Sequence, residues 1–154
     1  MYLSASLVFL ILSILVSASP EDLPLALSDM QSKSYFDFVI LLDMLNRTRK
    51  WSPYQEATFF MPTNKILGES GISREQLPKF ILGHAIPQAI AYSELSHVPT
   101  GTLIPSFVND RLLRVSSVGK QIFVNNAEII APDVCSSASI KCHGIDAVIV
   151  EGKE

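Results

Sequence analysis

The stretch that decides the fold is Ala57-Thr-Phe-Phe-Met-Pro-Thr-Asn64. Its first half combines β-forming and bulky apolar residues, which suit a buried strand. Pro62 has no N–H for a sheet ladder, so we expect the strand to end there. Thr63 and Asn64 carry short polar side chains that can cap a helix. The stretch therefore predicts a central strand, a corner and a short helix that ends at Gly68.

The composition sets broad limits on the class of protein. The chain has 154 residues with a net charge of −3, which is enough for one domain. Nucleic-acid binding requires clustered Lys and Arg, and a mildly acidic chain gives no reason to expect it. We therefore expect no nucleic-acid partner.

The N-terminal end has the pattern of a signal peptide. Residues 1–19 contain no charged side chain, and Leu7–Val16 is a compact apolar run. Val16 and Ala18 fit the small-residue positions before a cleavage site, so we expect cleavage after Ala18. The apolar run is short for a membrane span.

Secretion of a single mature domain follows from this pattern. Residues 1–18 would be the signal peptide, and residues 19–154 would form one domain. The C-terminal stretch 148–154 ends in polar residues and lacks the hydrophobic tail of a lipid-anchor signal. We expect an extracellular protein with no membrane anchor after signal cleavage.

Helical patterns dominate the first half of the mature chain. Residues 35–45 have apolar side chains at helical spacing and predict a largely buried helix, with Ser34 as its N-cap. Residues 23–29 predict only a loop or a single turn. Ser73-Arg-Glu-Gln76 is a capping-box pattern that begins a further helix, and Gly83 marks its end.

Strand patterns dominate the second half. The predicted strands are 85–91 at a sheet edge because of Pro87, then 102–104, 112–117, 121–124, 127–131 and 145–150. Turns are expected at 93–95, 118–120 and 125–126. Helices followed by mostly antiparallel strands predict an α+β fold.

The two cysteines favour a disulfide. Cys135 and Cys142 are an even pair in an exported chain, and the alternative is two thiols buried separately. The bridge would close a loop of about eight residues and contribute roughly 2–3 kcal/mol. Together with His143 the cysteines supply three ligands at the wrong spacing for zinc. We expect no metal and no cofactor.

The sequence shows no motif for catalysis. It has no nucleophile elbow, no metalloprotease motif and no phosphate-binding glycine loop. His143 and Asp146 lie three residues apart, which on a strand puts them on opposite faces, so we expect both to be structural hydrogen-bonders. Carboxylate pairs for glycoside hydrolysis come from distant loops, and nothing in the sequence singles out a pair.

One modification motif is present. Asn46-Arg-Thr48 is an N-glycosylation sequon, and in an exported chain it predicts a glycan at Asn46. The alternative is that these residues are a solvated helix end.

Three segments together resemble the fasciclin domain family. ATFFMPTNKIL (57–67) is similar to the first signature box, and IKCHGIDAVIV (140–150) to the second. LPKFILGHAIP (77–87) resembles the family's central Tyr-His segment. The order and spacing fit from Leu25 to Val150, and the second box looks closest to plant fasciclin-like arabinogalactan proteins.

The resemblance implies a compact fold and a role outside the cell. It implies an α+β fold, with helices packed on an antiparallel β-sandwich or wedge, and a module for adhesion or for matrix and cell-wall organisation without catalysis. The resemblance also implies structural roles for six residues, which are Thr58, Pro62, Thr63, Asn64, His143 and Asp146.

Adhesive contacts in animal members have been attributed to the Tyr-His segment and to an acidic motif before the second box. The resemblance therefore implies His84 and Pro132-Asp133-Val134 as adhesion contacts, although a histidine late in a buried helix is more often structural. Gly83 replaces the tyrosine of the pair, which puts adhesion through that segment in doubt. The Pro/Ala/Ser/Thr-rich stretches that carry arabinogalactan are missing, and the two cysteines suggest a subgroup loop.

The main hypothesis is a secreted adhesion module. Its partner would be a wall or matrix polysaccharide or glycoprotein, or a cell-surface receptor, and its location would be the apoplast or cell wall in a plant. The alternatives are a small secreted enzyme that acts on glycans, and a soluble ligand for a surface receptor.

Overall fold

The computed structural model describes residues 19–48, 51–52 and 55–151. The predicted signal peptide, residues 1–18, lies outside the described residues. Within the described part of the chain, no helix is long and apolar enough to cross a membrane.

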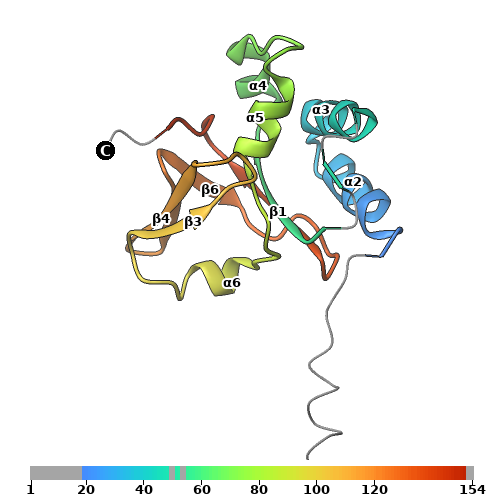
Figure 1. Ribbon diagram of the computed structural model, residues 1–154. Coiled ribbons are helices and arrows are strands. Elements are labelled where there is room, and N and C mark those ends of the chain that lie inside the picture. Colours follow the sequence, from blue (N-terminus) through green and yellow to red (C-terminus); the bar gives the residue numbers. More distant parts are fainter. Residues whose placement is uncertain (1–18, 49–50, 53–54, 152–154) are drawn as a thin grey trace, which may run out of the picture.

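Helices predominate in the first half of the described chain and strands in the second, in agreement with the α+β prediction (Figure 1). The helices of the described chain are α2 (Asp22–Ser32), α3 (Phe36–Arg47), α4 (Asn64–Ser70), α5 (Leu77–Gly83) and α6 (Tyr92–Leu95). The strands are β1 (Ala57–Pro62), β2 (Ala85–Ile86), β3 (Thr102–Pro105), β4 (Leu112–Val118), β5 (Gln121–Val124), β6 (Ala127–Ala131) and β7 (Ile140–Ile145).

One seven-stranded sheet holds the molecule together, in the order β2-β1-β7-β6-β5-β4-β3. β1 and β7 run parallel, and the other neighbouring strands run antiparallel. Figure 1 shows α2 and α3 on one side of β1, and β3, β4 and β6 on the other. The structure is therefore an α+β fold with N-terminal helices packed on a mostly antiparallel sheet.

The strand β1 separates two hydrophobic cores and is buried along its whole length. Because side chains alternate along a strand, Phe59 and Met61 face the helices while Phe60 faces the curled part of the sheet. The first core contains Phe38 and Trp51, whose rings meet Phe59 edge-on with centroids 6.1 and 5.6 Å away. The strand ends at Pro62, as its missing N–H predicts.

The prediction of a loop at residues 23–29 is wrong, because α2 covers this segment. Leu23, Ala26 and Met30 recur at helical spacing and are buried in the first core. The short apolar pattern is weak by itself, and packing against α3 and β7 stabilises the helix.

The predicted boundaries around β1 also need correction. Ser34 is not the N-cap of α3, because its backbone is left-handed, with φ of 68°, and Tyr35 precedes the helix. Gly68 does not end α4, which continues to Ser70 and is closed by Gly71 with φ of 63°. Gly71 supplies the left-handed C-cap that Gly68 was expected to supply.

Two strand predictions and one turn prediction are also corrected. The edge strand is limited to β2, because the Gln88 carbonyl and the Ile90 N–H bond to the Thr58 hydroxyl instead of to a strand. Residues 93–95 belong to α6 and are not a simple turn. The closing strand is β7 rather than residues 145–150, because the backbone of Val148 and Val150 bonds to the side chain of Asn126.

Candidate functional site

Thr58 holds the segment after β2 against β1. Its side chain is fully buried, and its hydroxyl donates to the Gln88 carbonyl at 2.6 Å and accepts from the Ile90 N–H at 2.8 Å. A buried hydroxyl with both hydrogen-bonding functions used stabilises the loop. Thr58 is therefore a structural residue.

The corner after β1 caps two different helices. Thr63 is the N-cap of α4, and its hydroxyl accepts from the Ile66 N–H at 3.4 Å. Asn64 instead reaches α3, where its Oδ1 accepts from the Asp37 N–H at 3.0 Å and its Nδ2 donates to the Ser34 carbonyl at 2.7 Å. Asn64 thus replaces the missing local cap of α3 from a distant position in the chain.

His84 is a core residue and not a surface contact in this structure. Its side chain follows α5, is 1% exposed and stacks on the Phe80 ring. Nε2 accepts from the Ile149 N–H at 2.9 Å, so the ring proton is on Nδ1, which donates to the Phe80 carbonyl at 2.8 Å. Burial is the main cause that lowers the pKa of His84 to about 4, opposed by the hydrogen bond to Phe80 and assisted by the Arg111 charge.

His143 and Asp146 do not contact each other as a base and its orienting group. His143 is fully buried, with Nδ1 accepting from the Asp133 N–H at 2.9 Å and Nε2 donating to the Ile90 carbonyl at 2.9 Å. Burial is the main cause that lowers the pKa of His143. The Asp146 carboxylate accepts from the Glu128 N–H at 2.8 Å. Both residues tie the end of β7 to neighbouring backbone.

The segment Pro132–Val134 lies at the surface between β6 and β7. Pro132 is exposed, Asp133 has a left-handed backbone with φ of 51° and a side chain that is 52% exposed, and Val134 is half-buried. The Asp133 carboxylate accepts from the Tyr92 N–H at 3.0 Å, at the start of α6. The motif predicted for adhesion therefore also positions α6.

A disulfide joins Cys135 to Cys142 of β7, and both residues are buried. The serines between them are used in bonds: the Ser139 hydroxyl donates to Asp22 of α2 at 2.6 Å, and the Ser137 hydroxyl accepts from the Ile140 N–H at 3.2 Å. The bridged loop therefore docks on the N-terminal helix and is not a free hairpin.

Asn46 lies in the last turn of α3 and is half-buried. The hydroxyl of Thr48, the third residue of the sequon, donates to the Leu45 carbonyl at 2.6 Å. Glycosylation at Asn46 stays a prediction.

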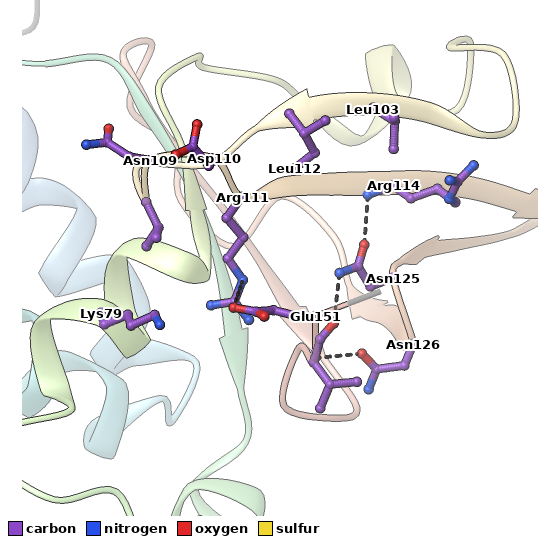
Figure 2. A pocket seen from close by; sticks show the side chains of 12 residues that line it. Lys79, Leu103, Asn109, Asp110, Arg111, Leu112, Arg114, Asn125, Asn126 and Glu151 are labelled. Carbon is purple, nitrogen blue, oxygen red and sulfur yellow. Dashed lines mark hydrogen bonds and ion pairs between the residues drawn. The ribbon is translucent and has the colours of Figure 1, made fainter. Parts of the chain in front are cut away.

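A hollow of about 770 Å³ lies between α5, the β3–β4 hairpin, the β5–β6 turn and the C-terminal segment (Figure 2). Its charged lining residues are Lys79, Asp110, Arg111, Arg114 and Glu151. Its aliphatic lining residues are Leu103, Val108, Leu112 and Val150. Amides at Asn109, Asn125 and Asn126 complete it.

Two asparagines of the β5–β6 turn build one wall of the hollow. Asn125 accepts from the Arg114 N–H at 2.8 Å and donates to the Val150 carbonyl at 2.9 Å. Asn126 accepts from the Val150 N–H at 2.9 Å and donates to the Val148 carbonyl at 2.8 Å. These bonds, which Figure 2 shows in part, fix the C-terminal segment without a strand.

Arg111 is the functional candidate that the sequence analysis missed. The β3–β4 loop positions it, because the Ser106 N–H donates to the Arg111 carbonyl at 2.9 Å. Its guanidinium lies against Gly83, where a Cβ atom would overlap Nη1 and come within 3.2 Å of Cζ. No local motif marks Arg111, and the only sequence signal was the glycine that admits it.

The acidic groups that line the hollow are Asp110 and Glu151. Glu151 faces Arg111 rather than a second acid. The described residues contain no group of three or more His, Cys, Asp or Glu side chains that could hold a metal ion.

Comparison with known proteins identifies the family. The fasciclin domain model matches residues 33–151. The chain belongs to the fasciclin domain family. Fasciclin domains are generally non-catalytic modules associated with cell adhesion.

Solved structures agree with the fasciclin fold. A fasciclin domain pair from the insect cell adhesion molecule fasciclin I superposes with a TM-score of 0.55 at 18% sequence identity. The match covers 76% of this chain and 44% of the insect chain, so this protein spans less than half of that domain pair. No curated protein is significantly similar in sequence.

The structure explains how this fasciclin domain accommodates Gly83 in place of the family's tyrosine. In the Tyr-His segment this chain keeps the histidine as a buried tether at His84 and replaces the tyrosine by Gly83. The Arg111 guanidinium occupies the space beside that glycine. The segment is therefore part of the wall of the hollow in this fasciclin domain.

Proposed function

We propose that this protein is a secreted, non-catalytic adhesion module that binds a component of the extracellular matrix or cell wall. The observation that carries the proposal is that two sets of polar residues have different environments. The polar side chains of the signature segments form internal bonds, whereas Lys79, Asp110 and Arg114 at the hollow are exposed to solvent. Such a surface serves recognition and not core stability.

Secretion fits both the predicted signal peptide and the buried disulfide between Cys135 and Cys142, since disulfides persist mainly in oxidising compartments. The similarity of the second box to plant arabinogalactan-associated members makes a cell-wall location the first to test. N-terminal sequencing of the secreted protein tests the first step, and we expect it to begin at Ser19.

Binding is tested by incubating the purified, secreted protein with fractionated wall polysaccharides, with matrix glycoproteins and with intact cells. We expect saturable binding to one of these fractions. The control is the same protein after reduction and alkylation in denaturant, which removes the fold but keeps the composition. If the folded protein binds no fraction, the adhesion proposal is wrong, and a receptor ligand or an enzyme would be sought instead.

A further inference from the structure

The hollow contains a guanidinium that lacks a full partner. The Arg111 side chain is only 14% exposed, and within the described chain its buried Nε has no hydrogen-bond acceptor. The Oε1 atom of Glu151 lies 3.7 Å from Nε, which is beyond hydrogen-bond distance, and the Glu151 side chain is 65% exposed. Figure 2 shows the two groups side by side, with the helix that carries Lys79 facing them.

Both the side chain and the backbone of Arg111 are held in position by neighbouring residues. The guanidinium rests on the backbone of Gly83, where any larger side chain would push it away. The backbone of the loop that carries Arg111 is closed by the hydrogen bond from the Ser106 N–H to the Arg111 carbonyl. A guanidinium that is held in place in this way loses little conformational entropy when it binds a ligand.

A buried cation with a distant counter-ion favours an incoming anion. Desolvation of the Arg111 charge is costly unless hydrogen bonds compensate it. A carboxylate can accept from Nε–H and from an Nη–H at the same time, which gives a bidentate pair that Glu151 does not form at its present distance. Lys79 adds a second positive charge at the same side of the hollow.

The rest of the lining indicates what carries the carboxylate. The walls are branched aliphatic side chains, and the described lining residues include no aromatic ring on which a sugar face could stack. The chain's own Val150–Glu151 places an aliphatic side chain and a carboxylate together at this site. A peptide with the same pairing matches the hollow better than an acidic sugar does.

We propose that the hollow binds an acidic peptide segment of a partner protein, whose carboxylate displaces Glu151 from Arg111 while a neighbouring aliphatic side chain packs on the wall. The inference deepens the adhesion proposal and rests on it, because it assigns a surface and a partner class to the same module. Glu151 then acts as an internal competitor for the site.

The test follows the Arg111 side-chain Nε–H signal by NMR during titration with a blocked peptide, acetyl-Gly-Val-Glu-Val-Gly-amide. The matched peptide with Gln in place of Glu removes only the charge. We expect the Glu peptide to shift this signal saturably and to bind at least about tenfold more tightly than the Gln peptide.

Variants of the protein test the same contact, and their peptide affinity is measured by isothermal titration calorimetry because Arg111→Lys lacks the Nε–H signal. Arg111→Lys keeps the charge but loses the fork geometry, and we expect at least about tenfold weaker binding. Glu151→Gln removes the competitor and should tighten binding several-fold. Arg74→Lys, at an exposed position that does not line the hollow, is the control and should leave binding unchanged.

Equal binding of the two peptides, or unchanged binding by both Arg111→Lys and Glu151→Gln, would overturn the inference. Binding of a galacturonate trimer in place of the peptide would also overturn it and would assign the hollow to acidic glycans. The same variants in the matrix and cell assay separate the two proposals. If Arg111→Lys retains wild-type adhesion, the hollow is not the adhesive surface, while the adhesion function stands.

Discussion

At the scale of single residues, the polar signature side chains act as tethers between segments that are far apart in the chain. Asn64 bonds across 30 residues to Ser34, and His84 across 65 residues to Ile149. Each of these bonds satisfies backbone groups that no regular element pairs. Their loss is therefore expected to affect stability first.

His84 makes the stability of the fold depend on pH. Its pKa falls from 6.5 to about 4 on folding, so the unfolded chain takes up a proton that the folded protein does not. The stabilisation is complete above pH 6.5 and is lost as the pH falls toward 4, by about 3 kcal/mol in total. Urea unfolding at a series of pH values measures this.

The variant His84→Ala separates this effect from the other acidic groups. At neutral pH it should unfold about 2–3 kcal/mol more easily, because the Ile149 N–H and the Phe80 carbonyl lose their buried partner. It should also have a flatter pH dependence than the wild type. An unchanged pH slope would show that another group, such as His143, dominates.

Asn64 is expected to matter more than its neighbour Thr63, although both are capping residues. Asn64→Ala removes two hydrogen bonds at the start of α3 and should cost about 1–2 kcal/mol. Thr63→Ala removes one long bond of 3.4 Å from the shorter α4 and should cost less. Thermal unfolding compares the two, and the reverse order would contradict the assignment.

At the scale of elements, β7 is the strand on which the others converge. It pairs with β1 and β6, receives α2 on its face and carries one end of the disulfide. The Tyr35 side chain that precedes α3 packs directly onto the backbone of Gly144. Close packing of this kind leaves no room for a larger residue.

A matched pair of glycine substitutions tests this packing. Gly144→Ala places a methyl group on the Tyr35 hydroxyl and 2.8 Å from the Ala131 Cβ, so it should destabilise the fold by about 1–3 kcal/mol. Gly68→Ala adds a methyl group in open space within α4 and should stabilise it by about 0.5–1 kcal/mol. The opposite signs are measured by calorimetry. Equal effects at both positions would contradict the packing.

The disulfide is the second device that fixes β7. Replacing both Cys135 and Cys142 by Ala should lower the free energy of unfolding by about 2–3 kcal/mol, because the unfolded chain loses a cross-link. Denaturant unfolding with and without reductant is the measurement. Reductant should shift the midpoint of the wild type and leave that of the variant unchanged. If the variant is as stable as the oxidised wild type, the disulfide does not stabilise the fold.

At the scale of the whole molecule, β1 and β7 form a wall between a helical core and a sheet core. The hollow lies on the sheet side, next to α5, whereas Asn46 lies at the end of α3 and does not line it. A modification at Asn46 and a ligand in the hollow would therefore occupy different surfaces.

This separation gives a prediction about glycosylation. Enzymatic removal of N-glycans from the secreted protein should lower its mass by one glycan, and Thr48→Ala should abolish that change. Binding in the matrix assay should stay the same after the glycan is removed. A protein that shows no mass change on treatment would overturn the prediction for Asn46.

The sequence by itself determined the fold class, β1 and its end at Pro62, α3, the hairpin strands and the pairing of the cysteines. These features depend on local chemistry: strand propensity, the missing proline N–H, helical periodicity and an even cysteine count. The family resemblance depended on the same local patterns.

Only the tertiary structure decided α2, the cap of α3, the extent of β7 and the role of Arg111. Each of these depends on a partner that is distant in the chain: α2 on β7, α3 on Asn64, the C-terminal segment on Asn126, and Arg111 on Gly83. A single sequence records the type of each side chain but not which distant backbone it meets. For that reason the candidate binding site, unlike the strand that organises the fold, could not be found from the sequence.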